Sequence, residues 1–219
     1  MAVCETSRHA ELMDDVYRWQ RHVYDLTRKY YLLGRDRMID HLSARPGTTF
    51  LELGCGTGRN IALAARRFPE ARFLGLDISA QMLATAEASL ARVGLSAKVR
   101  LAQADATDFD PQALFGRDRF DRVYISYSLS MIPGWQACVR QALGVLAPGG
   151  SLHIVDFGSQ ERLPGWFRAM LRAWLAKFHV APRDDLREVL ESEAQKAGAS
   201  LEFESLFRGY AVHAIVRKA

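Results

Sequence analysis

Short apolar runs alternate with helix-like patterns through the middle of the chain. Strands are predicted at about residues 48–53, 72–77, 99–103, 120–127 and 151–157. Helices are predicted between them at about residues 57–67, 81–93 and 133–146, and the last two begin near the start signals Ser79 and Pro133. Strands that alternate with helices in this way predict a parallel, doubly wound α/β sheet.

The two ends of the chain follow other patterns. Residues 201–204 and 212–216 alternate between apolar and polar positions around Gly209, which predicts an antiparallel hairpin at the edge of the sheet. Residues 10–45 carry an irregular apolar pattern that predicts two or three helices before the first strand. The expected fold is therefore a mostly parallel seven-stranded sheet, and 219 residues fit a single domain.

The insert between the fifth strand and the hairpin, residues 159–198, is amphipathic. Apolar residues at helical spacing form one continuous stripe, made of Leu163, Trp166, Phe167, Met170, Leu171, Trp174, Leu175 and Phe178. From Glu161 to Arg183 there are five basic residues and one acidic residue, and five minus one gives +4, which equals the net charge of the whole chain. Such a helix packs against the sheet or lies on an anionic membrane surface, and the pattern leaves both possibilities open.

Composition narrows the classes of function. A hydrophobic content of 49% with 25% charged residues is ordinary for a globular protein, and no apolar run approaches the roughly 20 residues of a transmembrane helix. The three cysteines are scattered and the six histidines have no ligand spacing, so we expect no metal site and a reducing, cytoplasmic environment. Aromatic and basic residues interleave over residues 17–37, but nearby aspartates offset the charge and argue against nucleic acid as a partner.

Residues 50–58, Phe-Leu-Glu-Leu-Gly-Cys-Gly-Thr-Gly, are the most informative segment of the chain. They predict a buried strand, a tight loop and a helix start, the turn that holds a nucleotide-like cofactor. Asp77 ends the next strand, where its carboxylate can accept hydrogen bonds from ribose hydroxyls. Arg59 stands where a dinucleotide fingerprint has its third glycine, and Glu52 would repel a pyrophosphate but not a cationic cofactor.

The pattern E-x-G-x-G-x-G resembles the first motif of class I S-adenosylmethionine-dependent methyltransferases. Three further segments fall in the order of that family: Asp77, the turn Gln-Ala-Asp-Ala at 103–106, and Leu-Ala-Pro-Gly-Gly-Ser-Leu at 146–152. The resemblance implies a Rossmann-like methyltransferase fold with S-adenosylmethionine as cofactor, a core at residues 46–158, a helical lid at 10–45 and a C-terminal hairpin at 199–219. An NAD-dependent oxidoreductase and a non-enzymatic scaffold are the competing interpretations.

Residues 17–36 carry a narrower resemblance. Tyr24-Asp25 resembles a pair on the lid helix of methyltransferases that act on quinones and phospholipids, and the longer run resembles the N-methyltransferase of betaine-lipid synthesis. This implies stepwise methylation of diacylglyceryl homoserine to the trimethyl betaine lipid, with phosphatidylethanolamine or a soluble amine as alternative acceptors. It also implies a lipid head group as substrate, a position on the inner membrane surface, and the aminocarboxypropyl transferase of the same pathway as a possible partner.

The candidate site residues follow from these motifs. Aromatic faces stabilise a nitrogen that becomes a quaternary cation, so the expected catalytic residues are Tyr24, Tyr31 and Tyr127. The residues expected to bind the cofactor are Tyr24, Arg35, Glu52, Gly54, Cys55, Gly56, Asp77, Ile78, Met82, Asp105, Ala106 and Ser126. Arg35 suits the carboxylate of the cofactor, and either Arg35 or Arg37 suits the carboxylate of a homoserine head group. The histidine that related phosphoethanolamine enzymes place after the fourth strand has no counterpart in residues 126–131.

Overall fold

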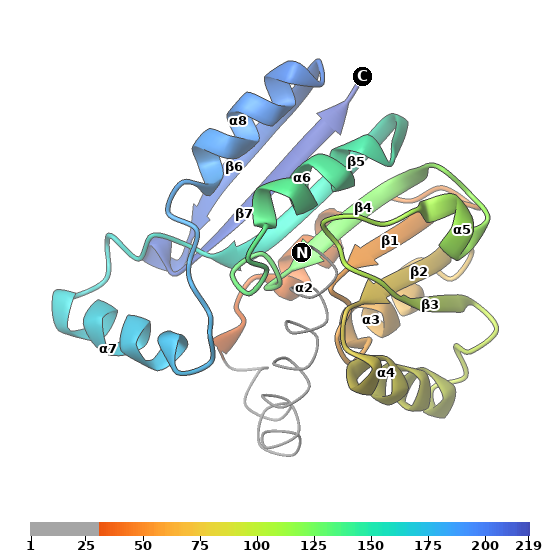
Figure 1. Ribbon diagram of the computed structural model, residues 1–219, viewed down its shortest axis with the longest axis horizontal. Helices are drawn as coiled ribbons and strands as arrows, with labels where there is room; N and C mark the ends of the chain where they lie inside the picture. The colour runs from red at the N-terminus through yellow and green to blue at the C-terminus, as the bar shows by residue number, and fades with distance from the viewer. Residues whose placement is uncertain (1–30) are drawn as a thin grey trace, which may run out of the picture.

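The structure, a computed structural model, describes residues 31–219. Tyr24 and most of the predicted lid at residues 10–45 lie outside the described residues. Within the described part, a seven-stranded sheet has the order β3-β2-β1-β4-β5-β7-β6 (Figure 1). Its strands are β1 Thr49–Leu53, β2 Arg72–Asp77, β3 Val99–Gln103, β4 Phe120–Ser126, β5 Leu146–Phe157, β6 Ala199–Leu206 and β7 Ala211–Lys218. Strands β1 to β5 are parallel and β7 is antiparallel to both neighbours, which confirms the predicted fold class.

Helices cover both faces of the sheet. They are α2 Arg35–His41, α3 Arg59–Arg67, α4 Ala80–Arg92, α5 Pro111–Phe115, α6 Trp135–Gly144, α7 Gly165–Ala176 and α8 Leu186–Lys196, and a 3₁₀ turn spans Phe207–Gly209. One face packs on α5, α6 and α8, and the other packs on α2, α3, α4 and α7. Figure 1 shows α6 and α8 in front of the sheet and α2 and α3 behind it. Alternate side chains of each strand therefore enter two separate cores, as the period of a strand requires.

Most predicted elements are confirmed to within two residues, and the exceptions have local causes. Ser79 caps α4 as expected, because its hydroxyl accepts a hydrogen bond from the Met82 amide at 3.2 Å. Strand β5 begins five residues before the predicted position, since Leu146 already pairs with Phe120 before the register shifts. The five-residue helix α5 was not predicted, because it is too short to show a periodic pattern.

The apolar stripe on α7 divides between the core and the surface. Leu175 is 1% exposed and packs with Leu171 on the sheet, as the core interpretation predicted. Trp166 is 72% exposed and Met170 is 54% exposed, so the first two turns leave large apolar groups uncovered. None of the helices that the structure describes is both long and apolar enough to cross a bilayer.

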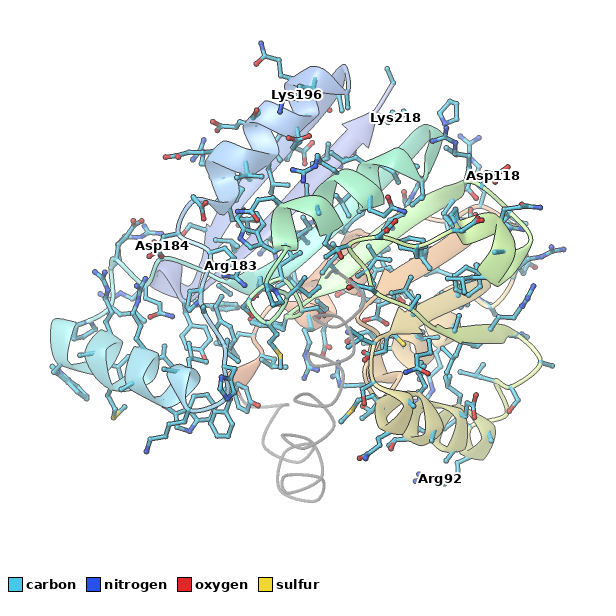
Figure 2. The ribbon with its side chains drawn as sticks, viewed as in Figure 1. Arg92, Asp118, Arg183, Asp184, Lys196 and Lys218 are labelled. Atoms are coloured by element: carbon cyan, nitrogen blue, oxygen red, sulfur yellow. The ribbon has the colours of Figure 1, made fainter. Side chains whose placement is uncertain are left out.

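The basic surface predicted beside this stripe is smaller than the +4 count suggested. Arg172 forms an ion pair with Asp184 at 2.8 Å, just outside the counted window. Arg183 donates hydrogen bonds to the carbonyls of Leu129 and Ile132 at 3.0 and 2.7 Å, so it fastens the segment after β4. Figure 2 shows Arg183 and Asp184 between α7 and α6. Two of the five bases are therefore structural, while Arg162, Arg168 and Lys177 are exposed.

Candidate functional site

A cavity of about 430 Å³ lies where the chain leaves the carboxyl ends of the central parallel strands. The strand order reverses between β1 and β4, and this switch point is where doubly wound sheets bind ligands. Ten predicted cofactor-site or catalytic residues line the cavity: Arg35, Gly54, Cys55, Gly56, Asp77, Ile78, Asp105, Ala106, Ser126 and Tyr127. Residues from four different strand ends and from α2 thus meet in one place.

The glycine loop between β1 and α3 forms one wall of the cavity. The amides of Gly54 and Cys55 both donate to the Leu76 carbonyl at 2.9 Å, which fastens the loop to the end of β2. Gly54 and Gly56 have φ angles of 70° and 52°, in the left-handed region that side chains disfavour. A Cβ at Gly54 would lie 2.4 Å from the Ser128 hydroxyl oxygen, so only glycine lets this loop meet the segment after β4.

Asp77 connects the loop to the start of the next helix. Its Oδ2 atom accepts a hydrogen bond from the Gly56 amide at 2.8 Å, and its Oδ1 atom accepts one from the Ser79 amide at 2.9 Å. The side chain is buried in the cavity wall. The Asp77 carboxylate thus orders the glycine loop and presents acceptor oxygens at the cavity wall.

Glu52 lies behind the loop and does not line the cavity. Its Oε1 atom accepts a hydrogen bond from the Asn60 amide nitrogen at 2.8 Å, and Asn60 itself reaches the cavity. Complete burial raises the pKa of Glu52 to about 8, so the group is mostly protonated at pH 7. The sequence argument that the charge of Glu52 repels pyrophosphate therefore does not hold at neutral pH, and its direct role in cofactor binding stays a prediction.

Asp105 and Ser126 come from the ends of β3 and β4, the outer two of the four strands whose ends line the cavity. One Asp105 oxygen accepts hydrogen bonds from the amide and hydroxyl of Thr107 at 2.8 and 2.7 Å, which orders the turn after β3. The hydroxyl of Ser126 is buried and has no hydrogen-bond partner within residues 31–219. Ser126 lines the cavity, but its hydroxyl oxygen is buried rather than exposed in the cavity wall, so a direct contact with the cofactor stays a prediction.

Arg35 places a positive charge in the wall from the side of α2. It is buried, lines the cavity, and its Nε atom donates to the Leu32 carbonyl at 3.3 Å. Nearby, Arg59 forms an ion pair with Asp36 at 3.0 Å and so connects α3 to α2. Arg59, which stands where a dinucleotide fingerprint has its third glycine, thus helps to hold α2, and with it Arg35, against α3. Arg37, the alternative carboxylate ligand, is instead exposed and pairs with Glu204 at 2.7 Å, away from the cavity lining.

The two predicted tyrosines that the structure describes occupy different positions. Tyr127 lines the cavity at a φ of 56°, and its hydroxyl donates to the Leu33 carbonyl at 2.5 Å. Burial raises the pKa of this hydroxyl well above its usual range, so the aromatic face is better suited than the hydroxyl oxygen to contact a substrate. Tyr31 lies beyond the cavity and packs edge-on against Trp174, with ring centroids 5.0 Å apart.

A second, small cavity of about 10 Å³ adjoins the first, and we call it the side cavity. Leu32, Tyr127 and Met131 line both cavities, so these three side chains form the partition between them. The rest of its lining is apolar or aromatic and consists of Tyr31, Phe157, Trp174, Leu175, Phe178 and Val180. Met82, predicted to bind the cofactor, lines neither cavity and packs between Ile78 and Met131.

Several lining residues were missed from the sequence. They are Leu32, Thr57, Arg59, Asn60, Leu76, Ala104, Thr107, Ser128, Met131, Ile132, Pro133 and Gly134. Thr57, Arg59 and Asn60 lie at or directly after the end of the glycine loop, and this position alone could have identified them as lining residues. Ser128 and Met131 come from the segment after β4, which carries no motif, so only the fold reveals their position.

Comparison with known proteins agrees with this geometry. Residues 50–150 match a family described as a methyltransferase domain. The chain is 36% identical over 48% of its length to a trans-aconitate 2-methyltransferase of Methylobacterium radiotolerans, covering 36% of that protein. It is 32% identical over 59% of its length to a phosphatidylethanolamine N-methyltransferase of Cereibacter sphaeroides, covering 60% of that protein. It thus spans between about a third and three fifths of these relatives.

Structural comparison supports the same fold. An O-methyltransferase family protein from Burkholderia thailandensis matches with a TM-score of 0.71 at 18% identity, over 93% of this chain and 61% of that one. The sheet order, the glycine loop and the acidic end of β2 define an α/β domain that binds an adenosine-type cofactor. With the match of residues 50–150, they indicate a methyltransferase domain at the core of this chain. Its cofactor is S-adenosylmethionine, and the Asp77 carboxylate and Arg35, which both line the cavity, fit polar groups of that molecule.

Proposed function

We propose that the protein is an N-methyltransferase that methylates the amine of diacylglyceryl homoserine stepwise to the trimethyl betaine lipid. The observation that carries this proposal is the apolar and aromatic wall on the acceptor side of the cavity, made of Leu32, Tyr127 and Met131. A trimethylated nitrogen cannot donate a hydrogen bond, and an aromatic face stabilises such a cation by roughly 0.5–2 kcal/mol. The resemblance of residues 17–36 to the betaine-lipid enzymes supports the head group.

The residues of the cavity divide between cofactor and acceptor. Asp77 would hold the ribose, Asp105 and Ala106 the adenine, and Arg35 the carboxylate of the cofactor. S-adenosylmethionine supplies an electrophilic methyl group for a lone pair on the acceptor nitrogen. The protein has to hold that nitrogen in line with the methyl group and exclude water, and Tyr127 and Met131 are placed to do both.

Loss of a proton from the acceptor amine has to precede each transfer. Among the described residues, no histidine lines the cavity, so the imidazole base of related phosphoethanolamine enzymes has no equivalent there. A desolvating wall lowers the pKa of a bound ammonium group, because burial disfavours the charged form. The apolar wall therefore favours the neutral amine that the reaction requires. Tyr24 stays the candidate for relaying the proton, since Tyr31 lies beyond the cavity, behind the partition.

We also propose that the protein acts at an anionic membrane surface on the cytoplasmic side. Trp166, Met170 and Phe207 are three of the exposed large apolar side chains of the described chain. Arg162, Arg168, Lys177 and Arg208 are exposed on the same segments. Apolar groups beside basic ones suit the interface of a bilayer that contains acidic lipids. At that surface the aminocarboxypropyl transferase of the same pathway would supply the acceptor.

A second candidate acceptor is phosphatidylethanolamine, which the relative from Cereibacter sphaeroides favours by name. The chemistry at the nitrogen would be the same, and only the head-group contacts would differ. A soluble small-molecule amine is the third candidate; the relative named for trans-aconitate, a small soluble acid, supports a small acceptor but not an amine as such.

A labelled-methyl assay on liposomes separates the three acceptors. Diacylglyceryl homoserine, phosphatidylethanolamine and free ethanolamine are offered side by side with labelled S-adenosylmethionine. Label in the homoserine lipid alone supports the proposal. Label in phosphatidylethanolamine alone would keep the methyl-transfer chemistry and make phosphatidylethanolamine the acceptor. Label only in ethanolamine, or in none of the three although the cofactor binds, contradicts a lipid acceptor. Asp77→Ala is the negative control, since it removes a cofactor contact without touching the acceptor wall.

A further inference from the structure

The side cavity and the surface of α7 are connected by one row of side chains. Trp166, Met170, Trp174 and Phe178 follow each other at steps of four residues, so they lie along one edge of α7 and of the turn that follows it. The exposed fraction falls along this row, from 72% at Trp166 and 54% at Met170 to partial burial at Trp174 and Phe178. We call these four residues the apolar row, and it leads from solvent to the partition beside the cofactor cavity.

The walls of the side cavity suit a hydrocarbon chain. The Trp174 ring packs edge-on against Tyr31 and Phe178, both at 5.0 Å, and Tyr127 packs against Phe157 at 4.8 Å. The hydroxyl of Tyr127 is already bound to the Leu33 carbonyl, so Tyr127 presents its ring to the cavity without an unsatisfied donor. An apolar site of this kind repels a head group and accepts methylenes.

The present volume of about 10 Å³ is smaller than one methylene group, so a chain enters only if a wall moves. Trp174, in the last turn of α7, and Phe178, in the turn that follows the helix, are the walls expected to move, because both are only partly buried. Leu175 and Phe157 are anchored in the buried core and are expected to stay in place.

We propose that the apolar row and the side cavity bind the alkyl or acyl chain of the methyl acceptor while its amine reaches the cofactor cavity. The ligand class is an amphiphilic amine with at least one hydrocarbon chain. The proposal rests on the proposed N-methyltransferase function and adds the site that selects acceptors by their apolar part. Three observations support it: the shared partition, the entirely apolar or aromatic lining, and the continuous row that leads to solvent.

The test measures binding of n-butylamine, n-hexylamine and n-octylamine by titration calorimetry, below their micelle concentrations and with S-adenosylhomocysteine present. Each buried methylene strengthens binding by roughly fourfold, so affinity should rise steeply with chain length. Val180→Phe fills the side cavity from a buried position and should flatten this rise, with butylamine affinity nearly unchanged. Val93→Ser, at an exposed apolar residue outside the row, is the control and should keep the rise.

Three results would overturn the inference: an equal rise in wild type and Val180→Phe, no rise in wild type, or a rise that Val93→Ser flattens as much as Val180→Phe does. Circular dichroism and cofactor binding check that Val180→Phe is folded. If it is not, Val180→Leu adds one methylene and gives the same comparison with a smaller expected change. Because no methyl is transferred in this experiment, it can fail while the liposome assay succeeds, and the reverse, so the two proposals are tested separately.

Discussion

The two sides of the cavity are formed by different kinds of groups. On the side of β1 and β2, the wall consists of main-chain groups and short side chains, with Gly54, Gly56 and Asp77 within 24 residues of one another. On the side of α7, the wall consists of long apolar side chains from distant segments, such as Leu32, Met131 and Trp174. A wall fixed by backbone geometry tolerates little change, whereas a wall of side chains can be altered one residue at a time. This explains how enzymes named for acceptors as different as trans-aconitate and phosphatidylethanolamine resemble one chain.

The largest effect is expected at Asp77, which holds the backbone side together. Asp77→Ala removes two hydrogen bonds from a carboxylate to the Gly56 and Ser79 amides as well as the expected ribose contact. Hydrogen bonds to charged groups are worth roughly 1.5–3 kcal/mol each, so affinity for S-adenosylmethionine should fall by at least about 100-fold. A calorimetric titration measures this, with Asp118→Ala as the control because Asp118 is an exposed aspartate in a loop. Wild-type affinity in Asp77→Ala would mean that the cofactor lies elsewhere.

Gly54→Ala tests whether the loop is held by close contact or by conformation alone. The φ of 70° costs a side chain about 1–2 kcal/mol, and the new Cβ would also collide with the Ser128 side chain. Gly116→Ala is a matched control, since Gly116 has a φ of 69° but nothing within 4 Å of an added Cβ. Urea unfolding should give a loss of about 1 kcal/mol for Gly116→Ala and about 2 kcal/mol or more for Gly54→Ala. Equal losses would show that the contact with Ser128 contributes nothing.

The backbone side could be predicted from the sequence, and the reason is physical. Gly54, Gly56 and Asp77 are constrained by positive φ angles and main-chain hydrogen bonds, so their residue types leave a pattern that a reader recognises. The parallel sheet also followed from the alternation of strands and helices, whereas the order of its strands came from the structure. Ser128 and Met131 left no such pattern, because any small polar and any flexible apolar side chain could occupy those positions.

The acceptor side was predicted only in outline. The apolar stripe on α7 was visible in the sequence, but periodicity does not show which edge of a stripe is covered by the rest of the protein. In the structure Trp166 is exposed and Leu175 is buried. The basic surface was overestimated, because Arg183 bonds to carbonyls of a loop 51 and 54 residues away in the chain. Contacts over such separations depend on the tertiary fold, which a count of charges does not contain.

A smaller effect is expected from Glu52, the buried acid behind the loop. Its folded-state pKa of about 8 lies above its ordinary value of 4.5, so its stabilising contribution is complete at low pH and is lost as pH rises through 8. Between pH 7 and 8.5 the cofactor-free protein should lose about 1 kcal/mol of unfolding free energy through this group. Glu52→Gln keeps an acceptor for Asn60 and should remove this loss, as urea unfolding at the two pH values measures.

The window from pH 7 to 8.5 is chosen because the other buried groups with shifted pKa values affect stability mainly at lower pH. Burial lowers the pKa of His153 to about 3 and that of His213 to about 4, so their contribution is complete above 6.5 and is lost only as pH falls below it. Burial raises the pKa of Asp156 to about 6, and most of its effect is over by pH 7. A wild-type loss above pH 7 that persists in Glu52→Gln would therefore assign the titration to another group.

The smallest effect on stability is expected at the exposed end of the apolar row. Trp166→Ser should change the unfolding free energy by less than about 0.5 kcal/mol, because the side chain is 72% exposed. It should nevertheless weaken binding to liposomes with acidic lipids several-fold, since it removes a large interfacial aromatic group.

Trp174→Glu would be a less informative variant, because Trp174 packs on Tyr31 and Phe178 and its loss would disturb the fold. Sedimentation with liposomes measures the binding, and Arg168→Ala separates the electrostatic part. Unchanged sedimentation of Trp166→Ser would contradict membrane contact through α7, and a large loss of stability would show that Trp166 is covered in the folded protein.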